Sequence, residues 1–350
     1  MKIALFEIST SHEECIYSQV KFLTDSGHSV SLVLNKALEN QIKTYSNLCE
    51  HIHFIDPIKV GAFKKLKQQW KLAHILRAYE VVVFNTASSS KTVRNLALLL
   101  KPFKVTCIGI LHNGRKLNSS FTQRIISLKI KKYLVLSDQI AEEIKQKRGF
   151  QVDSFYPIFF PDFAKVDLQK KSGIWIGIPG RIDWKRRDYT LLIDAMKAIP
   201  DLTNIKFLLL GRLDDKSSEG QKLWHLIQIN NLEDHFIVFD GFIANEDFHA
   251  YLKCCDYIMP LLSENEDYLS YKISGSFNLA YAYKKPLICN GYFKTLPDLQ
   301  ENGYFFDANR LPTLISNIHR NVLSNKNTYT STKWAYTYQK NKYVNFVTNN

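Results

Sequence analysis

The chain has 350 residues, of which 45% are hydrophobic and 23% charged, and its formal net charge is +13. This length allows two domains with full cores, and the composition is that of a globular protein, which excludes a disordered or fibrous chain. Its six cysteines lack paired CxxC spacing, so we expect neither a disulfide framework nor a zinc site.

The positive charge is concentrated in the first half of the chain. Residues 1–157 contain 23 Lys and Arg against 12 Asp and Glu, a balance of +11, whereas residues 158–350 contain 23 against 21, a balance of +2. No apolar run approaches the length of a membrane span, and the first residues show no signal-peptide cleavage pattern. We therefore expect a cytoplasmic protein whose first half faces an anionic surface.

The first half alternates between strand and helix patterns. Helical stretches at residues 14–26, 63–79 and 91–100 separate the short apolar runs, which predict strands at residues 2–8, 28–34, 51–55, 80–85, 103–111 and 133–137. Short apolar strands that alternate with helices indicate a parallel sheet covered on both faces. Residues 1–157 are therefore predicted to form an N-terminal Rossmann-like domain on the acceptor side.

A polar run interrupts this rhythm, and we interpret residues 158–173, which include Pro161, as an interdomain linker. The pattern then restarts, with strands and helices predicted in turn at residues 174–180, 188–198, 206–211, 220–229 and 236–243. Residues 174–331 are predicted to form a second Rossmann-like domain, and residues 332–350 a C-terminal helix or tail. The fold class is α/β, with two doubly wound domains facing a central cleft and ligands at the carboxyl ends of the strands.

A Ser-Gly turn in the second domain is the strongest candidate for a ligand-binding centre. Ser274 and Gly275 open a helix, so unpaired backbone N–H groups and the positive end of the helix dipole are available to a phosphate. Lys272 and Ser276 lie on either side of the turn. The alternative is an ordinary capped helix without a ligand, because Ser-Gly caps are common.

A second group of basic residues follows the strand that ends at Gly180. Arg181, Lys185, Arg186 and Arg187 lie between this strand and the next predicted helix, where they could neutralise a diphosphate. Cations near a helix N-terminus oppose its dipole and need a compensating reason. The alternative is a solvated basic helix start.

The order of these motifs carries a resemblance to a known family. It runs PGRIDWKRRDYTLLIDAM, KFLLLGRLDD, FIVFDGFIANEDFHAYLKCCDYIMP, the Ser-Gly helix and KKPLI. This order resembles the nucleotide-sugar-binding domain of glycosyltransferases with the GT-B fold, and is most similar to the retaining bacterial enzymes that build surface polysaccharides and glycoconjugates. The resemblance covers about residues 174–320, and residues 1–157 only by pattern.

The resemblance implies roles for the residues around the turn. Arg181 and one of Lys185, Arg186 or Arg187 would form the diphosphate clamp beside Gly180. The backbone amides of Ser274, Gly275 and Ser276 would hold the donor phosphates, and Lys272 belongs to the same stretch. Phe242 and Ile243, at the end of a predicted strand, match the wall on which such enzymes place the nucleobase.

The sequence departs from the family pattern at one point. The retaining enzymes carry two glutamates around this turn, and the matching positions here are Tyr271 and Leu279. Glu264 and Glu266 lie upstream and could reach the transferred sugar instead, although an exposed acidic loop is the alternative for at least one of them. The departure leaves the ribose contact and the stereochemistry open.

Two histidines of the first domain compete for a position near the reacting atoms. His112 follows a strand in the loop HNGRK, where the resemblance places residues next to the transferred sugar. His12 follows the first strand, where inverting relatives place a general base paired with a carboxylate, and Glu13 and Glu14 are its neighbours. A histidine that only hydrogen-bonds a loop is the alternative for either; we favour His112 as a donor-sugar contact.

These observations predict a glycosyltransferase that moves a sugar from a nucleotide diphosphate sugar, its donor substrate, to a saccharide or lipid-linked acceptor. We expect no cofactor and no metal, because the cations would neutralise the departing diphosphate. A non-catalytic partner of an active transferase is the alternative. We expect no nucleic acid as partner, since no binding motif accompanies the basic residues. The basic stretches at residues 63–79 and 124–132 predict contact with the inner face of an anionic membrane.

Overall fold

The computed structural model describes residues 1–58, 60–88, 90–145, 149–163, 166, 168, 170, 172–213, 218–323 and 326–349. The chain divides into two compact units. Unit 1 comprises Met1–Asp162, Ser270–Ile273 and Thr332–Asn350, and unit 2 comprises Phe163–Leu269 and Ser274–Ser331. Within the predicted linker, residues 164, 165, 167, 169 and 171 lie outside the described residues.

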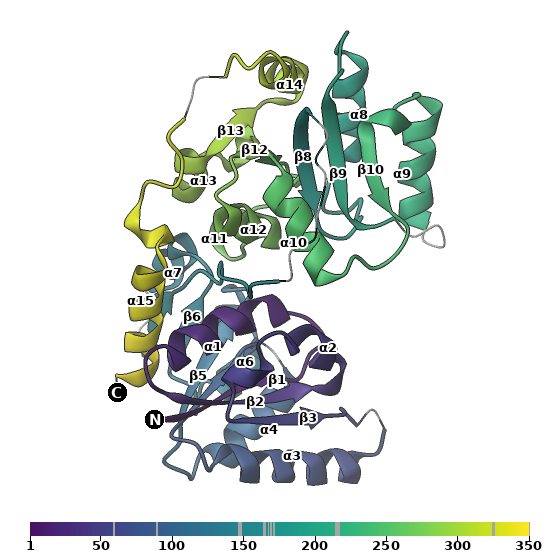
Figure 1. Cartoon of the computed structure of the whole chain (residues 1–350). Helices are drawn as coiled ribbons and strands as arrows, with labels where there is room; N and C mark the ends of the chain where they lie inside the picture. Colours follow the sequence, from purple (N-terminus) through teal and green to yellow (C-terminus); the bar gives the residue numbers. More distant parts are fainter. Residues whose placement is uncertain are drawn as a thin grey trace. The chain divides into compact units, whose positions relative to one another are not determined.

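Unit 1 is built on a parallel sheet that, in the described residues, has the strand order β3-β2-β1-β4-β5-β6-β7 (Figure 1). Its strands are β1 (Lys2–Glu7), β2 (Ser29–Asn35), β3 (His51–Ile55), β4 (Val81–Phe84), β5 (Thr106–Leu111), β6 (Lys132–Val135) and β7 (Gln151–Ser154). Its helices are α1 (Ile16–Thr24), α2 (Glu39–Ile42), α3 (Ala62–Leu76), α4 (Lys91–Leu100), α5 (Lys116–Ser119), α6 (Phe121–Ile126), α7 (Asp138–Lys145) and α15 (Tyr336–Thr348). The direction in which the strand order grows reverses at β1. Leu5 of β1 lies opposite Leu32 of β2 on one side and opposite Val83 of β4 on the other.

The central strands of unit 1 are mostly apolar because both faces of the sheet are buried there, whereas the edge strands β3 and β7 are partly exposed. On β1, Ala4 and Phe6 pack with side chains of α3, α4 and α6, whereas Ile3 and Leu5 pack with side chains of α1 and α15. Successive side chains of a strand point to opposite faces, so a doubly covered strand loses the polar alternation of a half-exposed one. This explains why apolar runs marked the strands in the sequence.

The C-terminal helix α15 packs within unit 1. Tyr343 is buried, and its hydroxyl donates a hydrogen bond to Oε1 of Gln19 on α1 at 2.9 Å. Gln339 accepts a hydrogen bond from the backbone N–H of Tyr156 at 3.0 Å. The basic, aromatic tail therefore completes a core layer of the first unit. In the part of the chain that is described, no helix combines the length and apolarity needed to cross a bilayer.

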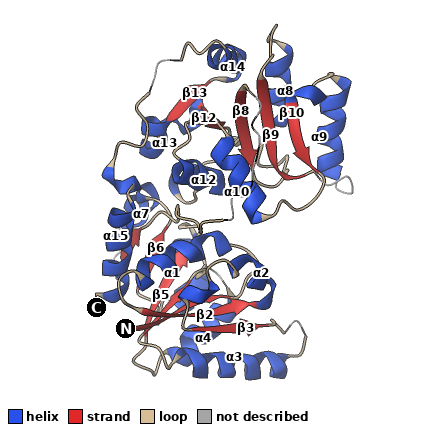
Figure 2. Cartoon of the chain, viewed as in Figure 1, coloured by secondary structure: helices blue, strands red, loops and turns tan. Residues whose placement is uncertain are grey.

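Unit 2 repeats the architecture, with the order β10-β9-β8-β11-β12-β13 over its described residues. Its strands are β8 (Ile174–Pro179), β9 (Ile205–Arg212), β10 (Phe236–Phe239), β11 (Tyr257–Ile258), β12 (Leu287–Asn290) and β13 (Gly303–Phe306). Its helices are α8 (Tyr189–Lys197), α9 (Ser218–Ile229), α10 (Asn245–Cys254), α12 (Gly275–Tyr283), α13 (Pro297–Asn302) and α14 (Leu311–His319), and α11 (Asp267–Ser270) leads toward the 270–273 segment of unit 1. Figure 2 shows α8 and α9 beside β8, β9 and β10.

The strand order of unit 2 reverses between β8 and β11. In open parallel sheets, loops at such a switch point diverge to opposite faces and leave a crevice at the carboxyl ends of the strands. The prediction of two doubly wound α/β domains is confirmed. The edge strands β7 and β13 were not predicted, because each has only four residues and their sequences, QVDS and GYFF, lack a distinct strand pattern.

Candidate functional site

The candidate phosphate site of unit 2 lies at the switch point between β8 and β11. Gly180 directly follows β8 and has φ of 111°, a conformation that side-chain-bearing residues rarely adopt. A Cβ atom at Gly180 would lie 2.5 Å from Nη2 of Arg187. Glycine is therefore required here for both its backbone conformation and the close approach of a guanidinium.

Arg187 joins the segments that form this site. Its Nη2 donates to the carbonyl of Pro179 at 2.5 Å and to Oγ of Ser276 at 3.4 Å, and its Nη1 donates to the carbonyl of Pro260 at 2.8 Å. These acceptors belong to the end of β8, the loop after β11 and the first turn of α12. One side chain thus ties together the three elements that meet at the switch point.

The partners of Arg187 are neutral although its side chain is only 7% exposed. Burial lowers the pKa of its guanidinium, which nevertheless stays protonated because its ordinary pKa is so high. Among the described residues no ion pair includes Arg187. The charge of Asp183 raises the pKa slightly but makes no ion pair with Arg187. A buried cation without an ion-pair partner costs several kcal/mol of desolvation, so this position favours a bound anion.

The start of α12 supplies further anion-binding groups. The Ser274 hydroxyl accepts from the backbone N–H of Ser276 at 3.4 Å, and the Ser276 hydroxyl donates to the Pro179 carbonyl at 3.0 Å. Both serines are buried, whereas Gly275 is exposed and nothing lies within 4 Å of where its Cβ would be. The Ser274 carbonyl also accepts from the backbone N–H of Phe277 at 2.9 Å, so the Ser276 and Phe277 N–H groups are used within the turn. The N–H of Gly275 has no acceptor among the described residues and is the one that faces a ligand most directly.

The other predicted cations differ in their surroundings. Arg181 is exposed just beyond Gly180, and Lys185 is exposed with its backbone N–H bonded to Oδ1 of Asp183 at 3.0 Å. The Arg186 guanidinium donates to the Tyr268 hydroxyl, from Nε at 3.0 Å and Nη2 at 2.5 Å.

Of the three cations that the sequence left open as the second clamp residue, Arg187 is the one bonded to the turn. Asp188 is the N-cap of α8, so Arg187 occupies the position before the cap. Hydrophobic residues at that position often pack against the helix, but an arginine gives no such signal, so the local sequence did not separate Arg187 from its neighbours.

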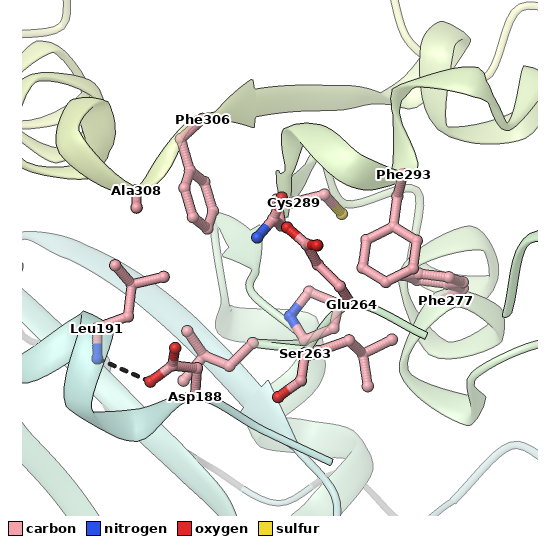
Figure 3. Close-up of a pocket in the computed structure, with 13 residues that line it drawn as sticks. Asp188, Leu191, Ser263, Glu264, Phe277, Cys289, Phe293, Phe306 and Ala308 are labelled. Atoms are coloured by element: carbon pink, nitrogen blue, oxygen red, sulfur yellow. Dashed lines mark hydrogen bonds between the residues drawn. The ribbon is translucent and has the colours of Figure 1, made fainter. Parts of the chain in front are cut away.

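Unit 2 also contains a cavity of about 260 Å³ (Figure 3), whose lining does not include Arg187. Pro260, whose carbonyl accepts from Arg187, is among its lining residues, which are Asp188, Leu191, Pro260, Leu261, Leu262, Ser263, Glu264, Phe277, Cys289, Asn290, Phe293, Phe306 and Ala308. Figure 3 shows the Glu264 side chain extending toward the space between Phe293 and Phe306. Glu266 is exposed and is not part of the lining.

Phe242 and Ile243 lie in a loop, which corrects the prediction that they end a strand. Strand β10 stops at Phe239, and Asp240 and Gly241 begin the loop that leads to α10. Phe242 is 79% exposed and Ile243 is half-buried. Such an exposed ring is available for stacking, although it is presented by a loop and not by the end of a strand.

The positions of the two absent glutamates have unrelated surroundings. Tyr271 packs in unit 1, where its carbonyl accepts from Gly114 N at 2.9 Å and Cζ of Arg115 lies 5.1 Å from its ring centre. Lys272, half-buried, belongs to the same 270–273 segment. Leu279 is half-buried on α12 in unit 2.

Two histidines stack in unit 1 at the carboxyl ends of its strands. The rings of His12 and His112 are 3.6 Å apart between centroids and inclined by 20°. Nδ1 of His12 is 3.5 Å from Oε1 of Glu14, and Nε2 of His112 is 2.7 Å from the carbonyl of Asn85. The sequence treated the histidines as competitors, whereas the fold brings them into contact.

Asn85 and Glu7, which the sequence analysis did not single out, hold this pair. Nδ2 of Asn85 donates to Oε2 of Glu7 at 2.8 Å and to the carbonyl of His12 at 2.9 Å. That second bond fixes His12 in a left-handed conformation, with φ of 67°, which is uncommon for a residue other than glycine. Asn85 directly follows β4 and Glu7 is the last residue of β1. These positions at the carboxyl ends of strands could have marked both residues as candidates in the sequence.

The pKa values of the two histidines shift in opposite directions. Burial lowers the pKa of His112 to about 4, and the neighbouring His12 adds to the shift. Burial would also lower the pKa of His12, but the hydrogen bond and charge of Glu14, with that of Glu7, outweigh it and raise the pKa. Burial raises the pKa of the adjacent Glu13, whose Oε1 accepts from the Tyr45 hydroxyl at 2.7 Å, to about 7. The pair can therefore hold one proton, on His12.

No family model matches the chain, and no curated protein matches it by sequence. Its fold is similar to that of Anabaena HepE in complex with UDP (TM-score 0.63, 14% identity, 99% of this chain and 96% of that chain). It is similar to a UDP-GlcNAc 2-epimerase from Methanocaldococcus jannaschii (TM-score 0.66, 12% identity, 99% of both chains) and to the lipopolysaccharide outer core galactosyltransferase WaaB in its apo form (TM-score 0.60, 14% identity, 99% of both chains). The chain thus has the predicted GT-B fold, which a transferase and an epimerase share. Within the described residues, no cluster of three His, Cys, Asp or Glu side chains could hold a metal.

Proposed function

We propose that this protein binds a nucleotide diphosphate sugar at the carboxyl ends of β8 and β11 and transfers the sugar to an acceptor hydroxyl. The observation that carries the proposal is the buried Arg187, which has only neutral partners and contacts the first turn of α12. A fixed guanidinium next to the Gly275 N–H and the positive end of the α12 dipole suits a diphosphate, which needs donors and positive charge. UDP is the first nucleotide to test, because similar folds have been solved with UDP and UDP-glucose.

The reaction requires the bond between the anomeric carbon and the diphosphate oxygen to break while a bond to the acceptor oxygen forms. The acceptor proton leaves to a base or to water, and the diphosphate departs with additional negative charge. Arg187, Arg181 and the α12 amides would stabilise that charge, so we propose that no metal is needed. EDTA should leave transfer unchanged if these groups suffice.

The remaining roles are assigned by position. Phe242 would stack on the nucleobase from its exposed loop, and Glu264 would accept hydrogen bonds from hydroxyls of the sugar in the cavity that it lines. His112 would contact the transferred sugar as a neutral imidazole, with His12 as the protonatable member of the pair. Retention of the anomeric configuration is proposed from the family resemblance, and proton NMR of the product anomer tests it.

The acceptor is proposed to be a saccharide or a lipid-linked glycoconjugate of bacterial surface polysaccharide synthesis, presented at the inner face of the cytoplasmic membrane. The +11 balance of residues 1–157 supports a partner at an anionic surface. A non-catalytic partner of an active transferase is the second candidate, because Tyr271 and Leu279 supply no carboxylate where the related enzymes have one.

The experiment that tests these proposals is a panel of nucleotide sugars incubated with the purified full chain. Thermal shift reports binding, and NMR of the mixtures reports slow donor hydrolysis, transfer to added acceptors or epimerisation of the sugar. A donor that binds and is hydrolysed or transferred supports the proposed enzyme. Binding without any turnover supports the partner role, epimerised donor contradicts transfer as the reaction, and the absence of any nucleotide binding refutes the site.

A further inference from the structure

The helix α3 of unit 1 presents an apolar stripe to solvent. Phe63, Leu66 and Trp70 are 80%, 48% and 59% exposed. Their spacing of three and four residues places them along one side of a helix, about 100° apart per residue step. Figure 1 shows α3 running along the outside of unit 1 beside α4.

The inner side of the same helix explains why this stripe is not part of the core. Leu72, Ala73 and Leu76 are buried, and Ile75 packs partly against the core. All residues from 60 to 67 are exposed. The helix is therefore anchored by its C-terminal half, while its N-terminal half keeps large apolar side chains in water. Isolated exposed apolar residues are common, but three in one helical row mark an interaction surface.

Lysines border the stripe on one side. Lys64, Lys67 and Lys71 repeat the spacing of Phe63, Leu66 and Trp70 one position further along, so they form a parallel row about 100° around the helix. All three are exposed, and α3 contains no carboxylate. An apolar row beside a purely basic row matches the boundary of an anionic bilayer, where acyl chains and phosphates lie at successive depths.

We propose that α3 is an interfacial membrane anchor. Phe63, Leu66 and Trp70 enter the headgroup and acyl boundary of an anionic leaflet, and Lys64, Lys67 and Lys71 contact lipid phosphates. Tryptophan favours this boundary, and lysine reaches the phosphates with its charged end while its stem stays near the apolar layer. This surface lies in unit 1 and rests on the proposed function in one respect only, because it specifies the place where the enzyme meets its acceptor. Membrane binding can therefore fail while nucleotide binding holds.

The other basic stretch does not present such a face. Ile126 and Ile130 are buried in the core of unit 1, and Ile125 is half-buried. Phe121 is 74% exposed on α6, which ends at Ile126, and the next exposed apolar residue, Leu128 at 52%, lies beyond the end of the helix, so α6 itself carries a single exposed aromatic side chain. This makes Phe121 a matched control for a single exposed aromatic side chain.

The test is flotation of the full chain, without nucleotide, on vesicles of phosphatidylcholine alone or with about a third phosphatidylglycerol. We expect binding only to the anionic vesicles, falling as the salt concentration rises from ~0.1 M to ~0.5 M. The triple variant Lys64→Gln, Lys67→Gln, Lys71→Gln should bind on the order of 100-fold more weakly. The exposed lysines Lys36, Lys43 and Lys101, changed to Gln together, serve as the control and should have little effect.

The apolar row is tested separately. Phe63→Ser with Trp70→Ser keeps all lysines, and should weaken binding at least about 10-fold, whereas Phe121→Ser should not. All five tryptophans lie in the described part of the chain, and Trp70 is the one that is exposed. Because insertion would move its ring from water into an apolar layer, vesicles should shift its fluorescence to shorter wavelength. Trp70→Phe should bind while losing that shift.

Three outcomes overturn the proposal. The first is equal binding to neutral vesicles, or none to anionic vesicles at low salt. The second is binding that survives the apolar variant, which would leave a purely electrostatic contact. The third is self-association of the chain through α3, abolished by the apolar variant, without vesicle binding, which would make the occupant a second copy. Unchanged thermal melting of each variant confirms that a loss of binding is not a loss of fold.

Discussion

Replacing Arg187 should separate phosphate recognition from nucleoside recognition. Arg187→Met removes the charge and the donors while keeping an unbranched side chain of similar length. The native guanidinium uses donors on the carbonyls of Pro179 and Pro260 and on the Ser276 hydroxyl, which leaves further N–H groups for a ligand. Hydrogen bonds that involve a charged group contribute about 1.5–3 kcal/mol each, so UDP should bind roughly 10- to 150-fold more weakly.

The effect of Arg187→Met on folding should be smaller than its effect on binding. The Pro260 carbonyl loses its donor, which costs about 1–3 kcal/mol if water does not replace it. The Pro179 carbonyl keeps the Ser276 hydroxyl at 3.0 Å. Removal of a buried cation without a counter-charge offsets part of this cost. We therefore expect a modest fall in melting temperature without loss of the folded state.

Isothermal titration with UDP and with uridine provides the decisive comparison. Arg187→Met should weaken UDP binding and leave uridine binding unchanged, because the nucleoside carries no phosphate. Arg187→Lys should recover only part of the affinity, since an ammonium lacks the planar fork. Arg320→Met, on an exposed arginine after α14, is the control. Equal losses for UDP and uridine, or none for either, would refute the assignment of Arg187 to the phosphates.

Four further predictions follow from the same geometry. Gly275→Leu should weaken donor binding at least about 10-fold with little change in melting temperature, because its Cβ meets open space while the side chain obstructs the approach to the Gly275 N–H; normal donor affinity would argue against the turn. Arg181→Ala should cost about 1 kcal/mol of donor affinity, as expected for an exposed cation, and full retention of affinity would remove it from the clamp. Glu264→Gln should reduce turnover with one donor sugar more than with another, and leave UDP affinity unchanged, if its carboxylate faces the sugar. His112→Asn should lower turnover about 100-fold or more and leave nucleotide affinity intact. It should also flatten the loss of stability at acid pH, because the pKa of His112 is about 4 in the folded protein and 6.5 ordinarily, so the unfolded chain takes up a proton first as the pH falls. That proton costs the native protein up to about 2 kcal/mol of stability at pH 5, less the opposing contribution of His12, whose pKa is raised.

The sequence predicted the parts of the fold that local chemistry determines. Doubly buried strands appear as apolar runs, and Gly180 and the Ser274-Gly275 turn can be recognised because backbone conformation and capping depend on the residues themselves. The end of β10 was placed too late, because Phe242 and Ile243 are apolar while Asp240 and Gly241 already leave the strand. Hydrophobicity alone did not reveal that these side chains lie in a loop.

Contacts between distant segments could not be predicted in the same way. His12 and His112 follow β1 and β5, which are separated in the sheet by β4, so their contact depends on Asn85 at the end of β4. Nothing in the local sequence of any one of these loops specifies the stacked pair. The sequence also left open which of Lys185, Arg186 and Arg187 is the second clamp residue. The three cations are adjacent, and only the packing of the helix that follows shows which of them turns toward the site.

The distinction between an ordinary capped helix and a ligand site rests on the charge that surrounds the cap. A Ser-Gly start satisfies its own turn, and the hydroxyls of Ser274 and Ser276 do so here without any ligand. An ordinary cap would gain nothing from a buried guanidinium beside it, because the positive end of α12 and the cation repel each other. The fold nevertheless holds Arg187 there, with a glycine required at position 180 and with no ion pair to a carboxylate among the described residues. Two like charges held together in the folded protein are stabilised jointly by an anion that binds both, and this is the physical reason why we propose the donor diphosphate at this turn.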